Sequence, residues 1–494
     1  MRGIETRIKE IRHRIFTEVA RMAYHTEWPT DQRIEELPYK IIPGEVGSFR
    51  SDVFLERAIV GERLRLAMGL PCRDASEHAK ISDNVADADK PETYYTPPLI
   101  NVIKFACNGC TEKRVFVTDG CQGCLAHPCV EVCPKTCVSL DRTNGRSKID
   151  QDVCIKCGKC AEVCPYHAVI IQERPCAAAC GMDAIHSDVH GKADIDYEKC
   201  VSCGQCLVNC PFGAIADKSQ IFQVIRAIQS GEQIYAAFAP AFVGQFGAKV
   251  TPGKIRMAMK KLGFTDVFEV AVGADLCATQ EANDFLSEVP DKLPFMATSC
   301  CPAWASMAKK LFPEIKDCIS MALTPMTLTA RLIKHYNPKG KVVFIGPCSA
   351  KKLEAMWDEV RSEVDFVLTF EEMAGIFASK HIDIENIEED PNGVNDASVD
   401  GRNFAVSGGV ATSVVNVIKN LRPELEVKTD NAEGLRDCRK LLMAAKAGKY
   451  NGYLLEGMGC PGGCVAGPGT MQAIKKSAAA VKTYASKASH ANSN

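Results

Sequence analysis

The sequence predicts an α+β protein with three successive parts: a helical N-terminal region, a cysteine-dense middle region and a C-terminal α/β region. Length and composition are the first evidence, because 494 residues with 46% hydrophobic side chains can bury several cores. The second is a crowding of thiols, since 17 of the 26 cysteines lie between Cys107 and Cys210. The third is that short apolar runs alternate with amphipathic stretches beyond residue 218, as strands and helices do in an α/β fold.

Charge and hydropathy exclude several classes of partner. Lysine and arginine number 59 against 61 acidic residues, so no basic excess is available for nucleic acid, and we expect none to bind. No window approaches the roughly 18 consecutive apolar residues of a membrane span, so we expect no membrane contact. The first 16 residues alternate charged and apolar side chains and lack the apolar core of an export signal. We therefore expect a cytoplasmic protein whose cysteines are metal ligands rather than disulfides.

The expected domains are residues 1–98, 99–217 and 218–476, followed by a flexible tail at 477–494 that is rich in Ala, Ser and Lys. In the first domain, apolar residues at three- and four-residue steps predict a helix, with no role assigned: Ile4, Ile8, Ile11 and Ile15. In the third domain, apolar runs at 234–238, 342–345 and 453–455 predict strands. There, residues 254–262 predict a helix and the acidic stretch 383–401 a surface loop.

Two stretches of the middle region match C-x2-C-x2-C-x3-C-P without a gap. They are Cys154, Cys157, Cys160, Cys164 and Cys200, Cys203, Cys206, Cys210. This is the bacterial [4Fe–4S] run, in which three close thiolates hold one cubane and the fourth reaches the neighbouring cubane. A zinc site, the alternative, would need two CxxC pairs that close one tetrahedron. Repeated runs of four favour iron–sulfur clusters.

A third run has two extra residues before its third cysteine. Exchange of fourth ligands with the Cys154 run predicts two cubanes, held by Cys121, Cys124, Cys129, Cys164 and by Cys154, Cys157, Cys160, Cys133. His127 lies inside this loop and is an alternative ligand, although a hydrogen-bonding or surface histidine is favoured while four thiolates are available. Cys137 aligns with alanines of the other runs, which predicts a small buried residue.

A fourth run is broken, with Gly181 in place of the proline after Cys180. Its remaining thiols predict two further cubanes, held by Cys180, Cys200, Cys203, Cys206 and by Cys107, Cys110, Cys176, Cys210. The middle region is therefore expected to form two ferredoxin-like modules with four [4Fe–4S] clusters. Such a region conducts electrons but performs no reaction by itself.

The C-terminal thiols occur in three loops, and each loop follows an apolar run. TSCCPAW occupies residues 298–304, PCSAKKLE residues 347–354 and EGMGCPGGC residues 456–464. Ligands of α/β sheets bind outside the carboxyl ends of strands, so we expect the three loops to converge on one site. Gly462 and Gly463 permit close approach of the backbone to a bulky cofactor. A nucleotide loop is not favoured, because GxxxxGK[ST] is missing.

These three segments resemble the signature segments of the [FeFe]-hydrogenases, in the same order, and the resemblance covers about residues 100–470. It implies a two-lobed α/β hydrogenase active-site domain that carries an H-cluster. In that cofactor, a [4Fe–4S] cluster shares one cysteine sulfur with a diiron unit bearing CO, CN⁻ and a bridging dithiolate amine. The implied reaction is 2H⁺ + 2e⁻ ⇌ H₂. The implied partners are ferredoxin or a similar one-electron carrier, and the hydrogenase maturation proteins.

The resemblance also assigns roles to residues of this chain. The cluster ligands would be Cys301, Cys348, Cys460 and Cys464, with Cys464 bridging to the diiron unit. Cys300 would pass protons to the amine, and Lys351 would hydrogen-bond a cyanide. The proton path would continue through Glu281, Ser320 and Glu354. Further cofactor contacts would come from Met458, Ala239, Pro240, Ala241, Ser407 and Gly408.

Simpler readings of these residues stay open at the sequence level. Lys351 would then be a solvated helix lysine, Met458 core filler and Glu281 a surface carboxylate. The unassigned thiols are interpreted as small buried residues: Cys72, Cys277, Cys318 and Cys438.

The segments also depart from common family residues at Ala241, Ala303, Met326 and Gly346. Such neighbours tune the potential and geometry of a metal site. One alternative is therefore a hydrogen-sensing or regulatory homologue with slow turnover. Another is a non-catalytic iron–sulfur assembly protein, which is disfavoured because the TSCCP and PCxxK segments are intact here.

Overall fold

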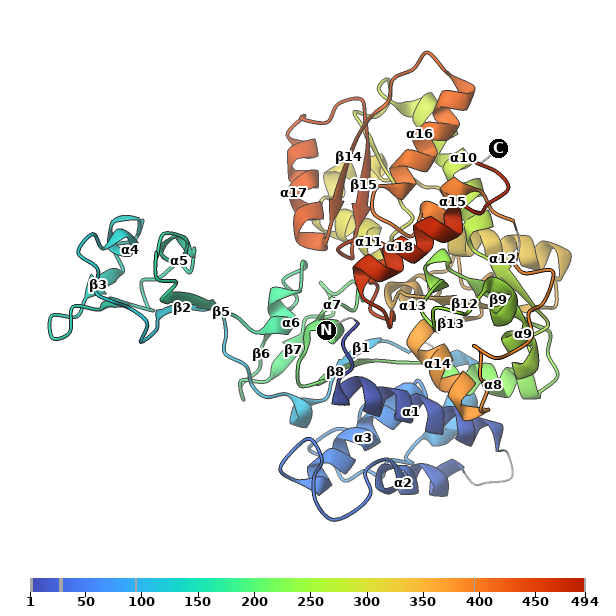
Figure 1. Ribbon diagram of the computed structural model, residues 1–494, viewed down its shortest axis with the longest axis horizontal. Coiled ribbons are helices and arrows are strands. Elements are labelled where there is room, and N and C mark those ends of the chain that lie inside the picture. The colour runs from blue at the N-terminus through green and yellow to red at the C-terminus, as the bar shows by residue number, and fades with distance from the viewer. Residues whose placement is uncertain (1–2, 26–29, 94–95, 395, 493–494) are drawn as a thin grey trace.

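The structure is a computed structural model that describes residues 3–25, 30–93, 96–394 and 396–492. It consists of an N-terminal helical region, two small cysteine-rich modules and a large body built on two parallel sheets (Figure 1). In the described part of the chain, no helix is both long and apolar enough to cross a bilayer.

The N-terminal helices are α1 (Arg7–Tyr24), α2 (Thr30–Ile41) and α3 (Val53–Ala67). Helix α1 begins where the hydroxyl of Thr6 accepts the amide of Lys9, at 3.3 Å. Its apolar face is buried against α14 (Phe370–Ser379) of the body. A Cβ on Gly375 would lie 2.5 Å from the Cβ of Phe16, so the two helices touch closely. The predicted N-terminal helix is confirmed from Arg7 onward and packs into the core of the body, but Ile4 lies before the helix and is exposed.

The two cysteine-rich modules are interleaved in sequence. The proximal module consists of residues 99–110 and 175–217, with helices α6 (Pro175–Ala178) and α7 (Gln205–Asn209). Its strands β1 (Ile100–Val102) and β8 (Ile215–Asp217) pair antiparallel, as do β6 (Ile185–Ser187) and β7 (Ala193–Ile195). The distal module, residues 111–174, is inserted between its two pieces.

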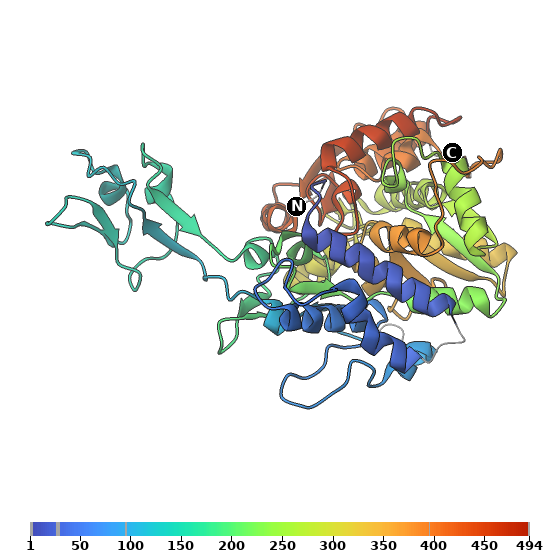
Figure 2. The same cartoon turned by 60° about the horizontal axis from the view of Figure 1, so that its bottom comes forward.

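The distal module repeats this plan. Strands β2 (Arg114–Val117) and β5 (Val169–Gln172) pair antiparallel, as do β3 (Val138–Leu140) and β4 (Ser147–Ile149). Its short helices are α4 (Pro128–Glu131) and α5 (Lys159–Glu162). The proximal module lies against the body, whereas the distal module projects away from it (Figures 1 and 2).

The body contains a four-stranded and a three-stranded parallel sheet. The four-stranded sheet has the order β10 (Asp266–Glu269), β9 (Ile234–Phe238), β12 (Lys341–Gly346), β13 (Phe366–Thr369). The three-stranded sheet has the order β11 (Met296–Ala297), β15 (Tyr453–Met458), β14 (Lys428–Glu433). The predicted strands at 234–238, 342–345 and 453–455 are therefore confirmed. All five residues of β9 are buried, as a strand covered on both faces requires.

The remaining helices cover these sheets (Figure 1). They are α8 (Ile221–Gln229), α9 (Pro252–Leu262), α10 (Ala271–Glu288), α11 (Pro302–Leu311), α12 (Pro325–Tyr336), α13 (Ala350–Glu354), α15 (Val399–Asn403), α16 (Gly409–Leu421), α17 (Leu435–Lys446) and α18 (Ile474–Ala485). Helix α10 contacts both α12 and α16, so it joins the surroundings of the two sheets. The predicted helix at 254–262 corresponds to α9.

The expected flexible tail at 477–494 is wrong for its first part, because residues 474–485 form α18. Ser477, Val481 and Ala485 lie on one buried face of this helix, and the amide of Gln245 donates to the hydroxyl of Ser477 at 3.0 Å. Alanine is the strongest helix former, so a composition that suggests disorder folds once one face finds a partner.

Candidate active site

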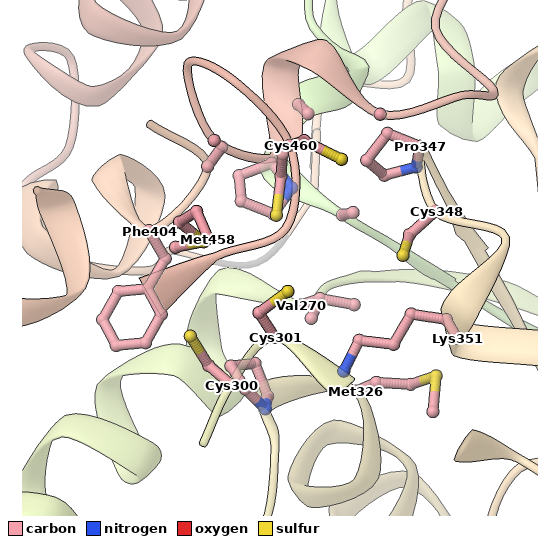
Figure 3. A pocket seen from close by; sticks show the side chains of 18 of the residues that line it. Val270, Cys300, Cys301, Met326, Pro347, Cys348, Lys351, Phe404, Met458 and Cys460 are labelled. Carbon is pink, nitrogen blue, oxygen red and sulfur yellow. The ribbon is translucent and has the colours of Figure 1, made fainter. Parts of the chain in front are cut away.

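The three cysteine-bearing loops of the body meet around one cavity of about 80 Å³ (Figure 3). One loop follows β12 of the four-stranded sheet, and the other two follow β11 and β15 of the three-stranded sheet. The loops contribute five thiols to the cavity wall: Cys300, Cys301, Cys348, Cys460 and Cys464. A water molecule needs roughly 10–15 Å³ by the same measure, so the space suits a group much larger than one ion.

Local structure brings the thiols inward. Cys301 caps the first turn of α11, where Pro302 begins the helix, and its sulfur accepts the backbone amide of Gly459 at 3.4 Å. Gly463 has φ +89°, and a Cβ there would lie 2.6 Å from the backbone nitrogen of Ser407. Only glycine fits so close to the backbone of Ser407. The turn at this position places Cys460 and Cys464 on the wall of the same cavity.

The donor set and the wall fit a large iron–sulfur cofactor. The wall between the thiols is apolar, with Ala239, Ala241, Phe404 and Met458 among its residues. Burial raises the pKa of Cys348 to about 11 and that of Cys464 to about 12. Thiols in such a dry place ionise readily only when a metal compensates the thiolate charge. Four soft donors around this space therefore match iron–sulfur ligation.

Lys351 is buried and points toward the cavity (Figure 3), so it is not a solvated helix lysine. Its ammonium lies 2.7 Å from a carboxylate oxygen of Glu354 and 2.9 Å from the hydroxyl of Thr324. Burial opposes the charge on Lys351, but Glu354 outweighs this effect and the net pKa is raised. Glu354 also accepts hydrogen bonds from Thr324 and Thr327. The structure thus places Glu354 as the partner of Lys351.

Behind Cys300 lies Glu281, whose side chain is fully buried, so it is not a surface carboxylate. One of its oxygens accepts the backbone amide of Ser299 at 3.0 Å, and the nearby hydroxyl of Ser320 opposes the rise in the pKa of the same carboxylate. Its second oxygen, Oε2, is buried without a hydrogen-bond partner. Burial raises the pKa of Glu281 to about 7, against the opposing effect of the Ser299 amide.

Cys300 stands between this carboxylate and the cavity. Burial, followed by the charge of Glu281, raises the pKa of the Cys300 thiol well above its usual value. Three of the residues assigned to the proton path, Cys300, Glu281 and Ser320, are therefore brought together. The hydrogen bonds of Glu354, the fourth, go to Lys351 and two threonines instead.

The other predicted cofactor contacts divide into two groups. Ala239, Pro240, Ala241 and Met458 line the cavity. Ser407 and Gly408 do not, because the wall there is formed by Phe404 and Ala405. The amide of Gly408 donates instead to Glu456 at 2.7 Å.

Two acidic residues near the site were missed. Asp284 lies three residues after Glu281 on α10, and burial together with the charge of Glu288 raises its pKa. The i, i+3 spacing on one helix was the available signal. Glu456 is buried beneath the cavity loop, accepts the amides of Gly408 and Ala411, and has a pKa raised by burial. Its burial was not visible in the sequence.

Three of the four predicted accessory groups each line a cavity of their own. These groups are Cys133, Cys154, Cys157, Cys160; Cys180, Cys200, Cys203, Cys206; and Cys107, Cys110, Cys176, Cys210. The fourth group, Cys121, Cys124, Cys129 and Cys164, lies within the distal module. In the described part of the chain, no three ligand side chains meet closely enough to hold a single ion. The thiols surround spaces instead, as ligands of a cubane do.

The thiols outside these groups differ in burial. Cys137 is buried, and its sulfur lies 3.3 Å from that of Cys133 at the same cavity. Cys277, Cys318 and Cys438 are buried as predicted, whereas Cys72 is half-buried.

Comparison with known proteins identifies the family. The family profile described as "Iron only hydrogenase large subunit, C-terminal domain" matches residues 232–468, a "4Fe-4S binding domain" matches 147–170 and an "LdpA Fe-S cluster-binding domain" matches 170–221. The chain is 30% identical to the periplasmic [Fe] hydrogenase large subunit of Nitratidesulfovibrio vulgaris over 67% of this chain and 88% of that protein. The chain belongs to the [FeFe]-hydrogenase family.

Other relatives match over a smaller share of their length. Iron hydrogenase 1 of Clostridium pasteurianum is 29% identical over 52% of this chain and 53% of that protein, so the match spans about half of this relative. The nuclear prelamin A recognition factor of Homo sapiens is 25% identical over 47% of this chain and 62% of that protein. Proteins with different names therefore match this part of the chain, so membership of the family does not by itself define the activity.

Proposed function

We propose that the chain is a hydrogenase that catalyses 2H⁺ + 2e⁻ ⇌ H₂ at an H-cluster. One observation carries the proposal: four ligand thiols, the additional thiol of Cys300 and the ammonium of Lys351 line a single apolar cavity. Structural iron–sulfur sites need only the ligands. The extra thiol, backed by a buried carboxylate with a free oxygen, adds a route for protons to that site.

The residues that would hold the cofactor are Cys301, Cys348, Cys460 and Cys464. When bound, the H-cluster would supply iron that exchanges electrons and activates hydrogen, and an amine that carries a proton. Lys351 would face the anionic ligands of the H-cluster, because Glu354 and Thr324 fix the ammonium at the cavity wall. The apolar side chains of Ala241, Phe404 and Met458 would exclude water, which strengthens this electrostatic contact.

Protons would travel between solvent and cavity through Ser320, Glu281 and Cys300. Glu281, with a pKa of about 7, exists in both protonation states near neutral pH, as a relay requires. Its unpartnered Oε2 offers a place for the transferred proton. Asp284, one turn along α10, is a further carrier toward the surface.

Electrons would reach the cavity through the two modules, with four [4Fe–4S] clusters at the grouped thiols. The donor would be ferredoxin or a similar one-electron carrier, and maturation proteins would insert the diiron unit. We also propose a cytoplasmic location, because the thiols that would hold the clusters are kept reduced in that compartment.

A second candidate is a hydrogen sensor with slow turnover, and Met326 favours it. This residue lines the cavity near Lys351 and is buried. Its thioether is at most a weak acceptor and donates no hydrogen bond to a cofactor. An intact H-cluster with turnover far below roughly 1 s⁻¹, the lower end for typical enzymes, would favour sensing over catalysis.

The cofactor is tested by the infrared spectrum of the anaerobically matured protein. Bands of CO and CN⁻ are expected, and Cys301→Ala should abolish them by removing a ligand. Their absence from the matured wild-type protein would refute the proposed activity.

Cys300 provides the test of the proton route. Cys300→Ala should keep the CO and CN⁻ bands but lose H₂ evolution by at least the roughly 10²–10⁴-fold typical of a positioned acid–base group. Cys300→Asp restores a titratable group and should recover part of the rate. Turnover close to wild type in Cys300→Ala would mean that protons arrive by another route.

A further inference from the structure

Gln205 connects an accessory thiol group to the active-site cavity. It lies in the proximal module between Cys203 and Cys206, at the first residue of α7, and it is buried. Its side-chain amide Nε2 donates to the sulfur of Cys460 at 3.1 Å, although the two residues are 255 positions apart. Gln205 thus lies in the loop that carries one accessory thiol group and donates a hydrogen bond to a thiol of the active-site group.

The contact is held by tight packing of the proximal module on the body. Gly204 has φ +72°, and a Cβ there would lie 2.6 Å from Pro468 and 3.1 Å from the hydroxyl of Ser349. Those residues belong to the loops that carry Cys464 and Cys348. The backbone beside Gln205 therefore has no room to shift, and the amide stays directed at Cys460.

Several accessory thiols in these modules accept hydrogen bonds from backbone amides of their own loop, as Cys200 does from Ser202 at 3.4 Å and Cys164 does from Ala168 at 3.3 Å. The donor to Cys460 is a side chain from another domain. An N–H group that faces a ligand sulfur stabilises negative charge there, and hydrogen bonds to sulfur are one of the factors that set cluster potentials. The donor therefore favours the reduced state of whatever cluster Cys460 holds.

We propose that Gln205 is a positioning residue that raises the reduction potential of the cubane held by Cys301, Cys348, Cys460 and Cys464. This inference rests on the proposed function, because it assigns that cubane to the cavity. The raised potential draws electrons from the cubane of Cys180, Cys200, Cys203 and Cys206 toward the active site. Gln205 thus links the docked proximal module to the thiol of Cys460.

The test is a potentiometric titration of the full-length protein with its iron–sulfur clusters, followed by electron paramagnetic resonance. Gln205→Met keeps the length of the side chain but removes the donor. It should lower the reduction potential of the active-site cubane by about 59 mV. For one electron, this changes the equilibrium constant for transfer from the accessory cubane about tenfold. Gln205→Glu removes the donor and adds negative charge, so its shift should be larger and in the same direction.

Gln223→Met is the matched control. Gln223 is also a buried amide in contact with another region, but it donates to the carbonyl oxygens of Met68 and Ala88 rather than to a thiol. Its substitution should leave all cluster potentials unchanged. A shift in both Gln205 variants but not in the control supports the proposal.

Unchanged potentials in the Gln205 variants overturn it, and so does loss of the cubane signal from both variants, which would mean a purely structural role. The infrared spectrum separates this result from the proposed function. If CO and CN⁻ bands are present while the potential does not move, only the inference about Gln205 fails. If the potential shifts in a protein that never shows these bands, the proposed hydrogenase activity fails and the tuning of the thiol-bound cubane still holds.

Discussion

The distal and proximal modules each carry eight of the predicted ligand thiols, but in opposite surroundings. In the distal module Cys157 is exposed, and Leu125 and Ile155 are 97% and 55% exposed. The module extends into solvent and pairs its own strands (Figure 2). In the proximal module, Gln205 reaches the active-site cavity, and the carboxylates of Asp183 and Asp217 pair with Arg439 and Lys352 of the body at 3.0 and 2.8 Å.

The cysteine spacing therefore determines which thiols share a cluster, whereas the surrounding chain determines the reduction potential of that cluster. Exposure, charge and hydrogen bonds to sulfur shift cluster potentials over a wide range. An exposed module suits exchange of electrons with a partner. A module fixed by close packing and a buried ion pair suits transfer to a defined neighbour within the protein.

The largest expected change comes from excision of the distal module. Arg114 and Gln172 pair across β2 and β5, so residues 114–172 begin and end side by side and a short Gly–Ser linker can replace them. The protein should lose two cubanes, about eight of roughly 22 irons, and keep the CO and CN⁻ bands. Iron analysis and infrared spectroscopy check this. Loss of the bands would show that the body depends on the distal module.

A smaller change is expected from Cys107→Ser combined with Cys110→Ser in the proximal module. One cubane, about four irons, should disappear, because these thiols share a cavity with Cys176 and Cys210. The control is Cys137→Ser in the distal module, which should retain every cluster although its sulfur is close to Cys133. Iron analysis and electron paramagnetic resonance distinguish the two. If Cys137→Ser loses a cluster and the double variant keeps all of them, the assignment of Cys107 and Cys110 as ligands is wrong.

Lys352→Met should leave all iron in place but weaken the docking of the proximal module. The ammonium of Lys352 is fully buried and pairs with Asp217 and Glu372, both at 2.8 Å. Its removal leaves two buried carboxylates without this ion-pair partner, at a cost of about 3–5 kcal/mol in the free energy of unfolding. The matched change in the distal module, Arg146→Met, breaks an exposed pair with Asp119 and should cost less than about 1 kcal/mol. Equal denaturation midpoints for the two variants would contradict this contrast.

The smallest expected effect concerns a buried carboxylate in the interior of the body, Glu281. The pKa of Glu281 rises from 4.5 to about 7 on folding. Its contribution to stability is therefore complete below pH 4.5 and is lost as pH rises to 7, by about 3 kcal/mol at most. Glu281→Gln removes this dependence, so its stability relative to wild type should increase between pH 5 and pH 8. Asp291→Asn, an exposed change just beyond α10, should show no such trend in denaturation midpoints.

Sequence reasoning succeeded where function depends on local spacing. The three loops of the body follow strands, and the carboxyl ends of strands gather ligands, so the convergence of Cys301, Cys348 and Cys460 could be predicted. Thiol spacing likewise anticipated which cysteines of the proximal module share a cavity.

The rest depends on tertiary burial and long-range contact. The pairing of Lys351 with Glu354 follows i, i+3 spacing, but its significance appears only once both groups are known to be buried. The bond from Gln205 to Cys460 joins distant segments, and no local pattern marks it. The helix at 474–485 was missed because its composition resembles a linker, while its stability comes from packing.

The proximal module is built from two segments that flank the distal module, so the two modules are completed at different times during synthesis. Cys107 and Cys110 are synthesised before the distal module, but their partners Cys176 and Cys210 follow it. All eight predicted ligand thiols of the distal module are therefore translated before the proximal module can complete either of its cubanes. Because domains generally fold as units during synthesis, the outermost clusters of the electron path can form first. The iron centres would then be assembled from the periphery inward, in the direction of the electron path proposed above.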